Sequence, residues 1–358
     1  MGRGRPFRPA VAGGRMELRG EGHRMDLSAI QIREGGEGRE SLTASLQAVA
    51  RWGGLEIEHD VLNAALGLSF MVCAPQRPEP SLRWESLARD WNLVNAARWL
   101  GMELRALHPP PAAAGVESAA EFQQHFVDSY APLIRQALEH HQPVLAWRGW
   151  PDELSWRWGV ITGTCEEGLG LRGTTVRREG LPVVLVAPAA QCYVVEHAAC
   201  PGLPDALEMV RFVMQAADTI AHNRVDPAFG VITGHGAYDV WLSLLGRDPA
   251  AFVDSGGVAL RLSHLARLVT FARRSGLGFL AAYRDRLDPS LRPVVDALAA
   301  AASGVIAALA VPRTAVSIEP MLRSAEGRDR LAADIRQARE AERALADPIR
   351  LLAVLTGG

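Results

Sequence analysis

The sequence contains no lysine, and all 38 of its basic residues are arginine. This absence excludes every mechanism in which a lysine amine forms a Schiff base or attacks a substrate. Cysteine is also scarce. Cys73, Cys165, Cys192 and Cys200 stand singly, without the short paired spacing of a zinc site. We therefore expect no metal and no cofactor, and we interpret the cysteines as reduced thiols of a cytoplasmic protein. A Cys192–Cys200 bridge is the alternative for an oxidising compartment.

Long apolar runs and a strong net charge are absent as well. No stretch approaches the roughly 18 uninterrupted apolar residues of a membrane-spanning helix. The formal net charge of −2 at pH 7 excludes a dominating attraction to nucleic acid or to anionic lipid. We expect a soluble cytoplasmic protein that binds neither nucleic acid nor membrane, and the sequence leaves its oligomeric state open.

The order of patterns along the chain predicts an α+β fold. Residues 1–24 are rich in Gly and Arg without an apolar period, which predicts a disordered tail. Helical spacing then dominates to about residue 140, and short apolar runs separated by Gly or Pro follow, as in an antiparallel sheet. We predict a first domain over 25–200, with a helical lobe and an antiparallel sheet, and an all-helical domain over 201–358. The helices predicted for the second domain cover 208–221, 238–245, 258–274, 292–310 and 328–355.

The apolar spacing in residues 40–54 predicts a helix, and we expect the first domain to be organised around it. Leu42, Leu46 and Val49 lie on one apolar stripe, and Gly53 ends the helix. Ser41 is at its N-terminal end, where unpaired N–H groups and the helix dipole stabilise an anion. A thiolate or the oxyanion of an acyl intermediate would be stabilised at this position.

Three segments carry a resemblance to a known family. They are this helix, the segment that follows it to residue 70, and the run Arg157-Trp158-Gly159-Val160-Ile161-Thr162-Gly163. Together they resemble the N-terminal domain of the butirosin-biosynthesis acyltransferase family, which is similar in fold to papain and to bacteriocin-processing peptidases. The family helix opens with Cys, followed by Ala and Leu where Ala44 and Leu46 stand here. The resemblance covers roughly residues 26–196. It implies Ser41 at the nucleophile position, Arg157 at the histidine position, and Gln31 as a candidate oxyanion-stabilising residue.

Both catalytic positions depart from the family. A serine hydroxyl is a weak nucleophile without an adjacent base, and the Arg157 guanidinium stays protonated and accepts no proton. Residues 169–175, where the family has Asp or Asn, contain neither. We therefore predict a catalytically inactive papain-like module that binds a small molecule, an acyl carrier or a peptide. The alternative is an acyltransferase or amide hydrolase of the butirosin type that uses Ser41 as nucleophile.

Arg157 and the amides near Ser41 would form a compact site for a carboxylate or a phosphate. The alternative is that Arg157 pairs with Asp152 or Glu153. His235 between two glycines could serve as a base or a ligand, but Gly234–Trp241 also fits a helix start that packs inward, which we favour. His140-His141 lacks a third ligand and is interpreted as an exposed helix end.

Overall fold

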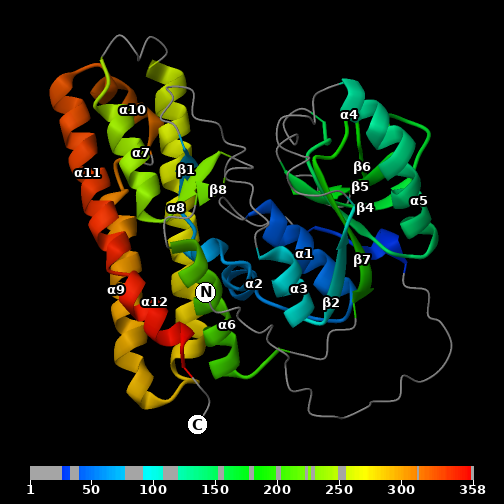
Figure 1. Cartoon of the computed structure of the whole chain (residues 1–358), viewed down its shortest axis with the longest axis horizontal. Coiled ribbons are helices and arrows are strands. Elements are labelled where there is room, and N and C mark those ends of the chain that lie inside the picture. The colour runs from blue at the N-terminus through cyan, green and yellow to red at the C-terminus, as the bar shows by residue number, and fades with distance from the viewer. Residues whose placement is uncertain are drawn as a thin grey trace, which may run out of the picture.

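The computed structural model describes residues 26–32, 40–76, 92–107, 120–151, 157–176, 181–198, 203–221, 225–226, 230–248, 255–312 and 314–355. The predicted tail over residues 1–24 lies outside these ranges. Figure 1 shows a group of helices on one side, a sheet covered by α4 and α5 on the other, and α1, α2 and α3 between them. The fold is α+β with antiparallel sheets and a helical C-terminal region, as the sequence predicted.

The larger sheet has six antiparallel strands in the order β2-β7-β3-β4-β5-β6. Its strands are β2 (Met102–Ala106), β3 (Val144–Trp147), β4 (Trp158–Thr164), β5 (Leu171–Thr175), β6 (Val183–Val184) and β7 (Gln191–Ala198). All four residues of β3 are buried, because this strand is central and covered on both faces. Gly173 allows β5 to approach β4 closely, since a Cβ there would lie 2.0 Å from the carbonyl oxygen of Val160.

The helical stretch that precedes β3 consists of three consecutive segments. These are α4 (Ala120–His125), the π-helical segment η5 (Phe126–Tyr130) and α5 (Ala131–Glu139). Phe126, Ile134 and Leu138 are buried, and α5 contacts β3 and β4. The apolar stripe of this helix therefore covers one face of the larger sheet.

The organising helix α1 (Ser41–Trp52) has the bounds that the sequence predicted. It contacts β4 and β7, and Gly53 ends it where a Cβ would lie 2.8 Å from the carbonyl oxygen of Ala198. Helices α2 (His59–Ala65) and α3 (Leu93–Trp99) follow α1, and the short 3-10 helix η1 (Leu27–Ala29) precedes it. Helix α1 thus spans the junction between the sheet and α2.

The apolar segment after α2 is not one extended run. Gly67 adopts a left-handed conformation (φ 79°) and starts the 3-10 helix η2 (Leu68–Phe70), and only then does β1 (Cys73–Pro75) begin. Strand β1 pairs with β9 (Val231–Thr233), which pairs with β8 (Val225–Asp226) in a second sheet that the sequence did not predict. This pairing joins residues on both sides of the domain boundary predicted near residue 200.

Eight helical segments make up the C-terminal part that the structure describes, with bounds given by α6 (Ala206–Ala221), α7 (His235–Leu245), α8 (Ser255–Arg284), η8 (Pro289–Leu291), α9 (Arg292–Ala308), α10 (Ala315–Leu322), α11 (Ala325–Arg343) and α12 (Ala346–Ala353). Helix α8 runs ten residues beyond its predicted end, because Gly276 packs against the ring of Phe70 instead of ending the helix. The predicted helix over 328–355 is two helices, α11 and α12. Helix α10 was not predicted, since Pro320 lies inside it.

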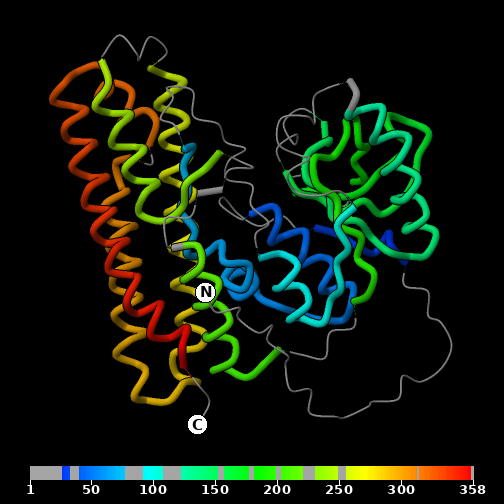
Figure 2. Tube along the Cα trace, viewed as in Figure 1, coloured from blue at the N-terminus to red at the C-terminus, as the bar shows by residue number. Residues whose placement is uncertain are grey.

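A buried polar chain fixes α8 against the N-terminal lobe. The Thr43 hydroxyl of α1 donates to Asn63 Oδ1 of α2 at 2.7 Å, and Asn63 Nδ2 donates to the hydroxyls of Ser69 and Ser275, each at 3.2 Å. Figure 2 shows the blue and cyan segment after α2 running beside the yellow helix α8. Because buried polar groups require partners, this chain specifies how α8 sits on α1 and α2.

An ion pair inside the helical part holds α8 to α11. Arg273 is fully buried, and its guanidinium bonds both carboxylate oxygens of Glu342. Its remaining donors reach the carbonyl oxygens of Ser69, at 2.9 Å, and Met71, at 3.3 Å. The Tyr238 hydroxyl donates to the same carboxylate at 3.4 Å. The pair therefore ties α7, α8, α11 and the segment after α2 together.

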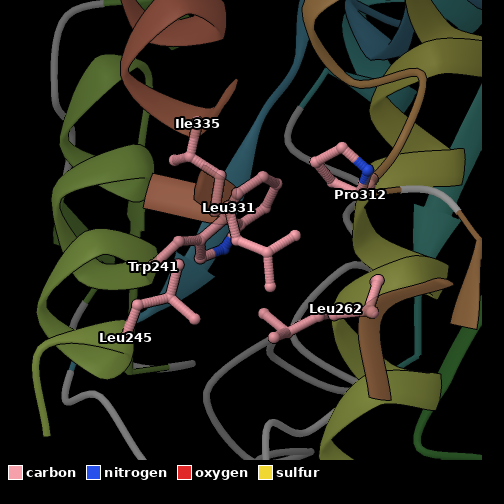
Figure 3. Close-up of a pocket in the computed structure, with 8 residues that line it drawn as sticks. Trp241, Leu245, Leu262, Pro312, Leu331 and Ile335 are labelled. Atoms are coloured by element: carbon pink, nitrogen blue, oxygen red, sulfur yellow. The ribbon is translucent and has the colours of Figure 1, made fainter. Parts of the chain in front are cut away.

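A second apolar core fills the space between α7, α8, α10 and α11. Trp241, Leu245, Leu262, Pro312, Leu331 and Ile335 surround a cavity of about 10 Å³ (Figure 3). A cavity of this size has room for about one water molecule, and its lining is almost entirely apolar. It is a packing defect of a dry core and no ligand site.

The segment Pro289–Ala308 is long and apolar enough to cross a membrane by length and composition, with a mean hydropathy of 1.5 and 28% of that stretch buried. Its helix α9 contacts α8, α11 and α12. Val295, Leu298 and Val305 are buried in these contacts. A core helix of a helical bundle passes the same test, and the expectation of no membrane partner stays a prediction.

Candidate functional site

Ser41 is held at the start of α1 by the first residue of β4. The backbone N–H of Trp158 donates to Ser41 Oγ at 3.1 Å, and Ser41 is 6% exposed. The structure thereby places Ser41 against Trp158, the residue that follows Arg157, although Ser41 and Arg157 are far apart in the sequence. The juxtaposition arises because α1 packs across β4.

Glu40 precedes Ser41 and brings a carboxyl to the place where the start of α1 meets Arg157 and Trp158. We call this place the corner. It is the N-cap residue of α1, but its side chain does not cap the helix. Burial raises the pKa of Glu40 from 4.5 to about 7, and the positive charge of Arg157 only partly offsets this effect. The Glu40 carboxyl is therefore partly protonated at neutral pH. No pattern in the sequence indicates this shift, since an acidic residue before a helix ordinarily stays in water.

His264 lies on α8, more than two hundred residues along the chain, and within electrostatic range of Arg157. Burial lowers its pKa from 6.5 to about 4, and the positive charges of Arg267 and Arg157 lower it further. His264 is thus a neutral imidazole at neutral pH. No motif marks it in the sequence, and only the packing of α8 brings it within the electrostatic reach of Arg157.

The hydrogen bonding of Ser41 decides what the corner can do chemically. Within the described part of the chain, Ser41 Oγ bonds the amide of Trp158 and neither an imidazole nor a carboxylate. An activated serine needs a base within hydrogen-bond reach. Arg157 is partly buried and acts on Glu40 and His264 through its charge. Asp152 and Glu153, its predicted alternative partners, lie outside the described residues.

Gln31 does not occupy a buried site. It is exposed, whereas Ile30 and Ile32 on either side are buried, so the alternating backbone turns the amide outward. Its side chain bonds no other residue that the structure describes. The short extended run from Ile30 to Ile32 carries this alternation in the sequence, and the pattern itself argues for an outward glutamine.

The buried glutamine of the sheet is Gln191, which the sequence analysis did not single out. It is 1% exposed, and neither Nε2 nor Oε1 has a hydrogen-bond partner among the described residues. Gln191 pairs with Trp147 across β7 and β3, and Trp147 pairs with Trp158 across β3 and β4. The amide therefore lies on the same sheet face as Trp158, two strands away. Its only signal in the sequence is an amide within an otherwise apolar run.

The remaining histidine candidates are structural in character. His235 begins α7, and Tyr238 and Trp241 are buried with ring centroids 5.2 Å apart, as expected for a helix start that packs inward. His140 is exposed at the end of α5, where its Nδ1 lies 2.7 Å from the carbonyl oxygen of Gln136. Among the residues that the structure describes, no group of three or more His, Cys, Asp or Glu is placed to hold a metal ion.

Comparison with known proteins adds nothing to this geometry. No protein-family model matches the chain, and no curated protein matches it. The candidate site is therefore the corner of Glu40, Ser41 and Arg157, with His264 within electrostatic range of Arg157.

Proposed function

We propose that the protein is a catalytically inactive papain-like module that binds a ligand at the corner of Glu40, Ser41 and Arg157. The observation that carries the proposal is the hydrogen bond from the Trp158 amide to Ser41 Oγ, without a base on that oxygen among the described residues. A hydroxyl held in this way is a structural and binding group. Among the residues that the structure describes, no proton acceptor of the kind that acyl transfer requires is hydrogen-bonded to it.

The ligand group that fits the corner is an oxyanion, and a carboxylate is the simplest example. The first N–H groups of α1 have no helical partner, and Arg157 adds a permanent positive charge. The Glu40 carboxyl opposes an incoming anion only when it is ionised. Because the pKa of Glu40 is about 7, a carboxylate should bind more tightly as the pH falls from about 8 to 6.

Binding of N-acetylglycine, measured by calorimetry across this pH range, tests the proposal. Its own carboxylate stays ionised throughout, so any pH dependence belongs to the protein. We expect Glu40→Gln to bind with little pH dependence and Arg157→Gln to lose most of the affinity. An affinity unchanged in Arg157→Gln would refute the corner as the binding site.

Restoring the missing groups tests the inactive character. Ser41→Cys alone should give no turnover, because Arg157 cannot pass a proton to the leaving group. Ser41→Cys with Arg157→His should gain reactivity toward an activated ester well beyond the sum of the single changes, since nucleophile and base act as a unit. The wild type, Ser41→Cys, Arg157→His and the double variant are compared by burst kinetics. A stoichiometric burst in the wild type would contradict the proposal.

A second candidate function, an acyltransferase or amide hydrolase using Ser41, is favoured by one observation. A carboxyl with a pKa of about 7 has the value suited to a general base at neutral pH, and Glu40 is adjacent to Ser41. In that case wild-type ester hydrolysis should rise with pH through about 7, and both Ser41→Ala and Glu40→Gln should abolish it.

A further inference from the structure

A groove separate from the corner runs along α8. It has a volume of about 430 Å³, within the range of small-molecule sites. Six residues of α8 line it, together with the residues at the start of α10; the six are Leu260, Ser263, Arg267, Thr270, Phe271 and Arg274. The groove is open to solvent along the helix, and half of its exposed lining is polar.

Two guanidinium groups in this groove have no anionic partner within the described ranges. Arg267 and Arg274 form neither a hydrogen bond nor an ion pair there, whereas Arg273 and Arg284 on the same helix each bind carboxylates. Arg267 and Arg274 are seven residues apart, which is two turns, so they share one helix face with about 10 Å between their positions along the axis. The groove therefore offers two separated positive charges.

The other lining groups restrict what the charges can bind. The hydroxyls of Ser263 and Thr270 donate to the carbonyl oxygens of Leu260 and Ala266, at 2.9 Å and 2.8 Å. Their protons are used inside the helix, so on the α8 side of the groove the guanidiniums are the donors available to an anion. Phe271 follows Arg267 by one turn and adds an apolar surface between the two arginines.

We propose that this groove binds a small organic dianion in which two oxyanion groups are joined by an apolar segment about two helical turns long. One oxyanion contacts Arg267, the other contacts Arg274, and the apolar segment lies on Phe271. Arginine binds carboxylate and phosphate groups in a bidentate manner, which gives the site its preference for oxyanions. The proposal uses no residue of the Ser41 corner and does not depend on the function proposed there.

His264 provides a spectroscopic report of occupancy. It lies one turn from Arg267, whose positive charge contributes to its lowered pKa. A bound dianion would offset that charge and raise the pKa of His264. An anion at Arg157 would also raise the pKa of His264, because the charge of Arg157 lowers it too. A sebacate-induced shift that disappears in Arg267→Gln therefore assigns the ligand to the groove, and one that persists in this variant contradicts the proposal.

The test measures binding of three carboxylates by calorimetry to the full-length protein. Sebacate has two carboxylates on a long apolar chain, succinate has two on a short chain, and decanoate has one. We expect sebacate to bind most tightly, and its affinity to fall as salt rises. A bisphosphonate of the same chain length distinguishes a phosphate ligand from a carboxylate ligand, and tight binding of either long dianion supports the proposal.

Matched variants on α8 locate the site. Arg267→Gln and Arg274→Gln should each weaken sebacate binding roughly tenfold or more, as expected for the loss of one charge-assisted hydrogen bond. Arg261→Gln removes the same charge from the same helix outside the groove and should leave binding unchanged. Far-ultraviolet circular dichroism verifies that each variant folds. Equal binding of succinate and sebacate, or equal losses in all three variants, would overturn the proposal.

Discussion

Replacement of Glu40 by glutamine tests the central electrostatic feature of the corner. Glutamine keeps the shape of the side chain and removes its ionisation. In the unfolded chain the carboxyl titrates near 4.5, and in the folded protein burial raises its pKa to about 7. Below pH 4.5 the group is neutral in both states. As the pH rises from 4.5 through 7, Glu40 ionises in the unfolded state before it ionises in the folded state. The free energy of unfolding of the wild type therefore falls over this range.

The size of the effect follows from the shift. Each pKa unit corresponds to about 1.4 kcal/mol, so ionised Glu40 destabilises the folded protein by about 3 kcal/mol above pH 7. The free energy of unfolding of Glu40→Gln, minus that of the wild type, should therefore rise by up to this amount between pH 4.5 and pH 8. His264 titrates with the opposite sign, losing stability as the pH falls from 6.5 toward 4, and it largely cancels because both proteins carry it.

Urea unfolding with linear extrapolation, repeated across this pH range, gives the difference directly. Glu56→Gln is the matched control, because Glu56 is an exposed carboxylate paired with Arg51. Its removal should change stability by no more than about 1 kcal/mol. A Glu40→Gln difference that is constant with pH would refute a buried carboxyl at the start of α1, and with it the pH dependence proposed for ligand binding.

Three further predictions concern the framework around the site. Glu342→Ala should lower the free energy of unfolding by about 3–5 kcal/mol in urea titrations, because it leaves the fully buried guanidinium of α8 without its carboxylate; a loss below 1 kcal/mol would contradict that burial. Gly173→Ala should lower the thermal midpoint, since its Cβ meets a backbone oxygen at 2.0 Å that no side-chain rotation can relieve, and an unchanged midpoint would argue against the close approach of β4 and β5. In native protein treated with iodoacetamide, mass spectrometry should find Cys165 labelled and Cys73 and Cys192 protected. Cys73 and Cys192 are buried, and burial raises the pKa of the Cys192 thiol. Fast labelling of Cys73 would instead indicate a reactive thiol.

The local elements follow from patterns that a single segment carries. The apolar stripe from Leu42 to Val49 and the stop at Gly53 predict α1 correctly, because helix periodicity and a terminating glycine act within a few residues. The strands of the larger sheet likewise follow from short apolar runs between glycines and prolines. The errors fall where a distant contact overrides the local signal, as at Gly276, where the ring of Phe70 packs on the helix and α8 continues.

The sequence by itself determined the α+β class, the helical C-terminal part, and the placement of Ser41 at a helix N-terminus. Tertiary structure alone decided that β1 pairs with β9, and that Glu40 and His264 both lie within the electrostatic reach of Arg157. The reason is physical. Periodicity and capping arise from neighbours along the chain, whereas a pKa depends on which distant segments exclude water and place charge around a group. Glu40 and His264 carry no local mark of their role because burial and the charge of Arg157, a residue distant from both in the sequence, create it.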